Sequence, residues 1–161
     1  MIVAIFESYK YVGHLYPLFF LRIFMGYYYL NHALQSVKSE FLSHAVLAEQ
    51  IRTYLPSSVA PEWYKYFLET AMIPNWQFFS SFIVISQFII GVSFIIGYFV
   101  RPASLLALFL GITMIWAVGP SSGDIQDNLI LLVVFTLGWF GAGRCLGVDY
   151  YFYRKRRGLW W

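Results

Sequence analysis

Residues 127–149 form the stretch that most constrains how this chain can fold. Their sequence, DNLILLVVFTLGWFGAGRCLGVD, is mostly apolar between an acidic start and the small-residue turn GAGR. An apolar run of this length suits one helix across the hydrocarbon layer of a membrane, for which about 20 residues suffice. The stretch therefore predicts an integral membrane protein.

The two ends of this predicted helix differ in charge. Asp124, Asp127 and Asn128 stand at its start, whereas Arg144 and the basic cluster at 154–157 follow its end. Because Lys and Arg concentrate on the cytoplasmic side of membrane proteins, we expect the basic end to face the cytoplasm.

The composition agrees with a membrane chain. Hydrophobic residues make up 60% of the sequence and charged residues only 12%, and the 13 Tyr and 6 Trp suit helix ends at lipid headgroups. The net charge of +3 is concentrated beside a hydrophobic span, so it predicts membrane orientation and no nucleic-acid partner. The length fits a single domain over residues 1–161.

Several site types are excluded by the residues that would be needed. Cys145 is the only cysteine, which rules out an internal disulfide, a cysteine-based zinc site and a CxxC redox pair. His14, His32 and His44 lack the close spacing of a ligand pair, so we expect no metal site. The N-terminus has no signal-peptide pattern, and we expect the first span to direct insertion.

We predict an all-α integral membrane fold, a bundle of four transmembrane helices. The spans cover about 15–37, 78–99, 102–118 and 127–143, and the segment 39–76 lies outside the membrane. Within that segment, residues 39–55 have apolar positions at helical spacing and predict an amphipathic helix, and a second short helix starts at Pro61. The basic tail 149–161 is expected at the cytoplasmic surface.

The distribution of Lys and Arg predicts the topology. Lys10, Arg101, Arg144 and the four basic residues at 154–157 fall on one side, against Lys38, Arg52 and Lys65 on the other. This bias predicts that both termini are cytoplasmic.

Polar residues inside spans are costly, so each is a candidate for a structural or functional role. Arg22 lies in the cytoplasmic half of the first span, where it either forms an ion pair with Asp149 or contacts an anion or a quinone headgroup. Gln87 lies near the middle of the second span, where it either bonds a neighbouring helix or binds substrate.

Four polar residues are expected at similar depth near the outer surface. Asn31 and His32 come late in the first span, and Asp127 and Asn128 come early in the fourth. They either line one outward-facing pocket, with His32 and Asp127 as the catalytic candidates, or merely satisfy hydrogen bonds.

At these residues the chain resembles the DoxX/DoxD-like membrane proteins, and in particular the small subunit of thiosulfate:quinone oxidoreductase. The specific part is the ending GAGR-x-x-G-x-D at 141–149 together with G-x-x-x-R-P at 97–102. Similar apolar and aromatic segments are LRIFMGYYYLNHALQ, QFIIGVSFIIGYFVRP and the external WYKYFLETAMIPN. The resemblance implies a four-helix membrane bundle strongly and a reaction weakly.

Two residues depart from the family pattern. Ser36 stands where many relatives have a Lys at the end of the first span, with Lys38 two positions away, and Gln87 stands where they have a Glu. Neither Ser nor Gln carries charge, so this chain has lost two groups that would stabilise an anion or move a proton.

The resemblance leads to three alternative functions. The first is an accessory or structural subunit of a larger quinone-linked or other bioenergetic complex, respiratory or photosynthetic, in a bacterial or archaeal cytoplasmic membrane. The second is a catalytic thiosulfate or sulfur-compound:quinone oxidoreductase subunit, and the third and least favoured is a small-molecule transporter. We expect contact with lipid, with other membrane subunits and with quinone as a candidate ligand, but no covalently bound cofactor. The expected partner contacts are the aromatic residues Trp63, Tyr66, Phe67, Trp160 and Trp161.

Overall fold

A computed structural model describes residues 16–39, 41–42, 45–58, 60–118, 124–144 and 147–149. Every regular element within those ranges is helical. Four long helices contain most of the described residues: α2 (Tyr16–Lys38), α5 (Trp76–Ile96), α6 (Val100–Val118) and α7 (Asp124–Phe140). The all-helical prediction is therefore confirmed for the part of the chain that the structure describes.

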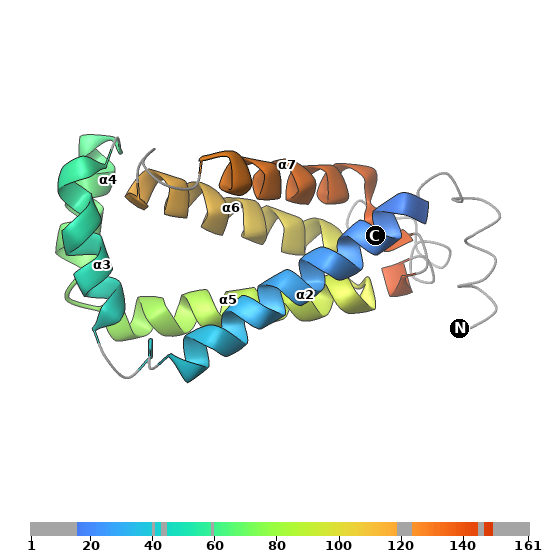
Figure 1. The fold of residues 1–161 in the computed structure, drawn as a ribbon, viewed down its shortest axis with the longest axis horizontal. Helices are drawn as coiled ribbons and strands as arrows, with labels where there is room; N and C mark the ends of the chain where they lie inside the picture. The colour runs from blue at the N-terminus through green and yellow to red at the C-terminus, as the bar shows by residue number, and fades with distance from the viewer. Residues whose placement is uncertain are drawn as a thin grey trace.

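The long helices form an elongated bundle in which helices that follow each other in the chain run antiparallel (Figure 1). α5 packs against α2 and α6, and α6 packs against α7. The shared core consists of apolar side chains from all four helices, among them Met25, Ile90, Phe94, Ala107 and Leu137. The helices lie close to the ranges expected for the four spans, with α5, α6 and α7 each beginning two or three residues earlier.

Two glycines allow the closest helix contact in the bundle. A Cβ atom on Gly91 would lie 2.6 Å from Leu30 Cγ, 2.9 Å from Leu30 N and 3.0 Å from Gly26 O. A Cβ atom on Gly26 would meet the backbone of α5 just as closely, at 3.0 Å from Gly91 O. Small residues of this kind let two helix backbones approach each other inside membranes.

We expect Gly91→Ala to destabilise the bundle by about 1–3 kcal/mol, the usual cost of forcing a group into a filled space. The backbone of α2 cannot move aside, so this cost exceeds the helix-propensity gain of about 1 kcal/mol from Gly to Ala. Gly111→Ala is the matched control, because its Cβ would meet only the flexible side chain of Leu131. Thermal unfolding in detergent checks the pair; equal melting temperatures for both variants would contradict the prediction.

The outside of the bundle is covered with large apolar side chains. Each long helix exposes several of them, including Phe24 on α2, Ile85 on α5, Phe109 on α6 and Leu132 on α7. Water-soluble proteins rarely expose contiguous apolar surface on this scale, whereas lipid tails are compatible with it.

By length and hydropathy, one helix within the described residues is long and apolar enough to cross a membrane, namely Trp76–Ile96. The apolar parts of the next two helices are shorter, at Val100–Trp116 and Asp127–Phe140. α2 is long enough, at 23 residues, but polar residues such as Arg22, Asn31 and His32 lower its hydropathy.

A smaller helical layer lies across one end of the bundle (Figure 1). It consists of α3 (Val46–Tyr54), a 3-10 turn (Leu55–Ser57), α4 (Glu62–Phe67) and a π-helical turn η3 (Leu68–Met72). This layer has its own apolar cluster, which includes Leu47, Ile51, Tyr64 and Leu68. The first helix is shorter than the 39–55 expected, because α2 extends to Lys38 and the chain then turns before it can cross the bundle end.

Candidate functional site

Gln87 is an amide side chain near the middle of α5, a helix whose residues are mostly apolar. Its side-chain oxygen Oε1 is buried and has no hydrogen-bond partner in the described part of the protein. The predicted helix-to-helix hydrogen bond is therefore not made through this oxygen. Gln87 instead forms part of a cavity wall, so its role in substrate binding stays a prediction.

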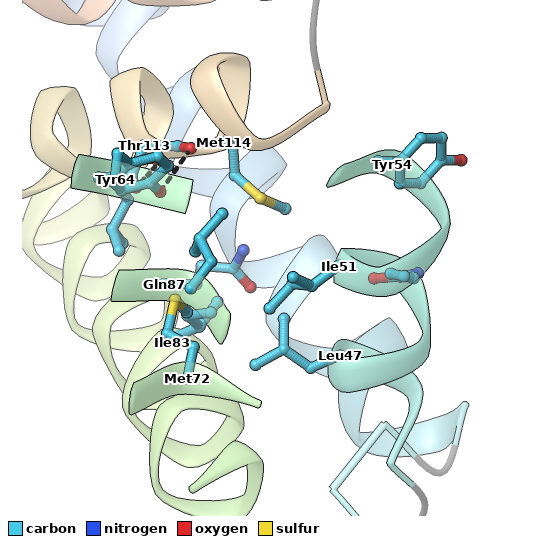
Figure 2. Close-up of a pocket in the computed structure, with 12 residues that line it drawn as sticks. Leu47, Ile51, Tyr54, Tyr64, Met72, Ile83, Gln87, Thr113 and Met114 are labelled. Atoms are coloured by element: carbon cyan, nitrogen blue, oxygen red, sulfur yellow. Dashed lines mark hydrogen bonds between the residues drawn. The ribbon is translucent and has the colours of Figure 1, made fainter. Parts of the chain in front are cut away.

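The cavity lies between the outer helical layer and the bundle and has a volume of about 90 Å³. In Figure 2, Gln87 lies between Met114 of α6 on one side and Ile83 and Met72 on the other, with Leu47 and Ile51 of α3 opposite. Most of the wall is apolar, and the polar side chains that line it are Gln50, Tyr54, Tyr64, Gln87 and Thr113. The ring of Tyr54 points away from the cavity.

Tyr64 attaches the outer layer to the bundle. Its hydroxyl donates a hydrogen bond of 3.0 Å to the backbone oxygen of Thr113, drawn as a dashed line in Figure 2. Its ring also contacts Trp116 edge to face, with the ring centres 5.8 Å apart. Burial raises the pKa of the Tyr64 hydroxyl, so this donor stays protonated well into the alkaline range.

The turn that follows α4 is a π-helix, a rare element that often occurs at functional sites. Its wider turn is closed by the hydrogen bond from Ile73 N to Leu68 O, 3.0 Å long. Leu68 and Met72, the first and last residues of this turn, both line the cavity. The unusual backbone therefore lies at the wall of the cavity.

The two buried charged residues lie at the opposite end of the bundle. Arg22 is 0% exposed and its Nη1 donates a hydrogen bond of 2.8 Å to Ala142 O, just beyond the end of α7. Asp149 is 2% exposed and accepts hydrogen bonds from Phe99 N, at 2.8 Å, and from Val100 N, at 3.2 Å. The carboxylate thus caps the N-terminus of α6, and the guanidinium lies near a helix C-terminus, where each charge is favoured.

Glycines make room for these two side chains. Gly97 has a left-handed backbone, with φ at 71°, and a Cβ there would lie 2.8 Å from the Arg22 Cζ atom. A Cβ on Gly143 would collide with the Asp149 carboxylate. The structure therefore brings Arg22 and Asp149 to one end of the bundle, as expected, while a direct ion pair between them stays a prediction.

The four residues expected at an outward-facing pocket lie in the C-terminal half of α2 and near the start of α7. His32, Asp127 and Asn128 are exposed and Asn31 is half-buried. The rings of His32 and Tyr28 contact each other with their centres 4.4 Å apart, and Asp127 lies within electrostatic range of Tyr28. Neither of the two cavities described here is lined by any of the four residues.

The second cavity is an apolar groove between α2 and α7, with a volume of about 460 Å³. Among the described residues, Tyr28 is the one polar side chain in its wall, and the others are Leu21, Phe24, Met25, Leu129, Ile130 and Val133.

The expected partner-contact residues on α4 are at the surface. Trp63 is 65% exposed, Tyr66 69% and Phe67 41%. Phe67 also packs edge to face on Phe79, with ring centres 6.0 Å apart. Trp160, Trp161 and Cys145 lie outside the described residues. Among the described residues, no group of three His, Cys, Asp or Glu side chains could hold a metal ion.

Nothing in the sequence singles out Tyr64, Thr113 or Met72 for a site. Tyr64 is one of several aromatic residues in α4, and nothing local distinguishes the one that turns inward. The one usable signal was Gln87, because a lone amide in an apolar span requires a partner.

Comparison with known proteins identifies the family. The sequence model of the DoxX family matches residues 17–120, from the first turn of α2 past the end of α6. No curated protein matches the chain, and no solved structure does so either. The matched residues include both glycines of the α2–α5 contact and Gln87, and they cover more than half of the sequence. The chain is therefore a membrane protein of the DoxX family.

Proposed function

We propose that this DoxX-family protein is a four-span subunit of a larger bioenergetic membrane complex and that its role there is structural. Its resemblance to the small subunit of thiosulfate:quinone oxidoreductase supports a quinone-linked complex. The accessory role follows from what its polar residues do.

This proposal rests on one observation, namely that the buried charged residues stabilise the fold. Arg22 and Asp149 are bound to backbone groups at the ends of helices, where they satisfy atoms that the helices leave without partners. These bonds support a structural role over contact with an anion or a quinone headgroup. The cavity beside Gln87 has no acidic or basic side chain among the described residues that line it, which gives little means of proton transfer.

The outer layer supplies the surface for a partner. Trp63 and Tyr66 project from α4 with most of their area exposed, and α4 itself is fixed to α6 by Tyr64. Rigid aromatic anchors of this type dominate the binding energy of many protein interfaces.

The proposal includes a topology with both termini in the cytoplasm and residues 39–76 outside. The exposed apolar side chains on all four long helices support four spans, and the distribution of Lys and Arg supports the orientation. In a Cys145→Ser background, a cysteine at the exposed Glu62 should react with a membrane-impermeant maleimide added to intact cells. A cysteine at Lys10 should react only after the cells are opened. Labelling of the two sites in the reverse order would refute this topology.

Mild-detergent purification from the native membrane tests the proposal as a whole. We expect the chain to elute with other membrane subunits, at a mass well above its own 18.8 kDa plus a detergent micelle, and extraction of the sample should yield quinone. A chain that elutes alone and still reduces a quinone analogue with thiosulfate would overturn the structural role.

One observation favours the catalytic alternative. His32 and Tyr28 of α2 are in ring contact, and Asp127 of α7 lies within electrostatic range of Tyr28. Such a group can relay protons during oxidation of a sulfur compound. We rank this alternative second because these side chains are exposed.

A further inference from the structure

The cavity beneath α3 and α4 is lined by a buried hydrogen-bond acceptor that has no donor among the described residues. Gln87 Oε1 is buried without a donor within the described residues, and the side chain forms part of the cavity wall. A buried polar atom of this kind is costly, so native proteins usually place a water, an ion or a ligand beside it. Gln87 therefore points to an occupant of the cavity.

Of the other polar side chains in the wall, Gln50 is exposed and the ring of Tyr54 points away from the cavity, so Tyr64 and Thr113 show what kind of occupant fits. The Tyr64 hydroxyl donates to Thr113 O, and the Thr113 hydroxyl donates to Leu110 O at 2.8 Å. Both hydroxyl protons are thus used within the protein, whereas the oxygens keep free lone pairs. The described residues of the wall include no charged side chain, so the site calls for an uncharged donor of hydrogen bonds.

The size of the cavity restricts the occupant further. A volume of about 90 Å³ corresponds to about three waters, at about 30 Å³ each in the liquid. It is well below the range of about 300–1,000 Å³ typical of pockets for drug-sized ligands. The wall around Gln87 includes Ile83, Met72 and Met114, and the two methionines are flexible enough to adapt to an aliphatic stem (Figure 2).

We infer that this cavity binds the hydroxyl end of an uncharged aliphatic alcohol. The hydroxyl donates a hydrogen bond to Gln87 Oε1, and the stem lies against Leu68, Met72 and Met114. The π-helical turn Leu68–Met72 supports the inference independently, because it shapes this wall. The alcohol is either a short one that enters from water or a long-chain one from the outer leaflet. This inference does not depend on membership of a larger complex.

Fluorine NMR of the full-length protein in phosphatidylcholine vesicles tests the inference with three probes. 4-Fluorobutan-1-ol is added from water, 12-fluorododecan-1-ol is incorporated in the bilayer, and 1-fluorobutane lacks the hydroxyl. We expect a saturable shift for at least one alcohol and none for 1-fluorobutane. Saturation by the short alcohol assigns the ligand to the aqueous phase, and saturation by the long one alone assigns it to the bilayer.

Two matched variants locate the site. Gln87→Leu removes the acceptor and should weaken binding of the alcohol by about tenfold or more, the equivalent of one hydrogen bond. Gln77→Leu removes an exposed amide from the same helix, outside the cavity, and should bind as the unaltered protein does. Without any alcohol, Gln87→Leu should melt at a higher temperature than the unaltered protein, because it no longer buries an unsatisfied oxygen.

Three results would each overturn the inference. The first is that 1-fluorobutane binds as tightly as the alcohols, and the second is that neither alcohol gives a saturable shift. Both of these results can be obtained even if Gln87→Leu fails to fold, because they are measured on the unaltered protein. The third is an equal loss of binding in Gln77→Leu and Gln87→Leu.

Discussion

Replacing Asp149 with Ala is expected to lower the free energy of unfolding by about 3–5 kcal/mol, the range for removing one member of a buried charged network. The variant loses the carboxylate that accepts from Phe99 N and Val100 N, which leaves both donors at the start of α6 without this cap. Asp149 is also the predicted partner of the Arg22 guanidinium, which is buried beside Gly97. The variant leaves that guanidinium without this anion. Chemical unfolding in detergent measures the loss.

Local geometry explains why the loop between α5 and α6 needs this carboxylate. Phe99 has a positive φ of 55°, a conformation that is costly for an aromatic residue and needs support from its surroundings. Asp149 supplies that support twice, because its own N–H also donates to Gly97 O at 3.0 Å. The loop between α5 and α6 and the segment after α7 are therefore held together through one residue.

Matched variants separate this effect from a general loss of charge. Asp127→Ala removes an exposed carboxylate and Arg52→Met an exposed guanidinium, and each should change stability by less than about 0.5 kcal/mol. Arg22→Met should cost nearly as much as Asp149→Ala, and the double variant should cost less than the sum by about 0.5–3 kcal/mol. Strict additivity would refute the predicted pairing of Arg22 with Asp149, and a loss below about 1 kcal/mol for Asp149→Ala would refute its role as a cap.

The sequence was sufficient to predict the bundle because its determinants are local. Apolar runs of the right length located α5 and α7, although the predicted ends at 99 and 143 lie three residues past the observed ends at Ile96 and Phe140. The shared depth of Arg22 and Asp149 could be predicted for the same reason, since helix length alone fixes how far a residue lies along the bundle. The close contact of Gly26 with α5 required three-dimensional information, because it depends on how the two helices are rotated about their axes.

The cavity could not be predicted, because long-range contacts create it. Tyr64 and Thr113 are 49 residues apart and come from different layers, and no spacing rule in either segment indicates that they meet. The expected pocket of His32 and Asp127 rested on depth alone, and depth does not decide whether a side chain turns inward or outward. In the structure, the side chains of both residues are exposed at the surface.

The two ends of the molecule thus have different properties. At the end with Arg22 and Asp149, charged side chains and left-handed residues fix the loops to one another. At the other end, the Tyr64 hydrogen bond, ring contacts with Trp116 and Phe79, and an apolar cluster hold the outer layer over a cavity. The cavity and the exposed aromatic residues of α4 both lie at this end of the molecule.

Replacing Trp63 and Tyr66 together with Ala is expected to release the protein from its complex. Each truncation of an aromatic anchor in an interface typically costs at least about 2 kcal/mol, or about 30-fold in Kd. Both side chains are exposed in the isolated chain, at 65% and 69%. Trp63 also packs edge to face on Trp116 of α6, with ring centres 6.2 Å apart, so thermal unfolding of the double variant must first show that the fold is retained. Phe67 is less suitable, because it is only 41% exposed and packs on Phe79 of α5. Co-elution with the partner subunits after mild-detergent extraction provides the measurement.

The control is an aromatic residue of equal exposure on a different surface. Tyr27 is 64% exposed on α2, and Tyr27→Ala should leave the complex assembled. His32→Ala and Asp127→Asn should likewise leave electron flow through the complex nearly unchanged, because the structural role does not use them. If the protein is instead the catalytic subunit, the order reverses: these two variants would lower turnover by about 10²-fold or more, the usual scale for a lost proton-transfer group. The double variant of Trp63 and Tyr66 would then retain its activity, so measuring assembly and turnover on the same four proteins decides between the two functions.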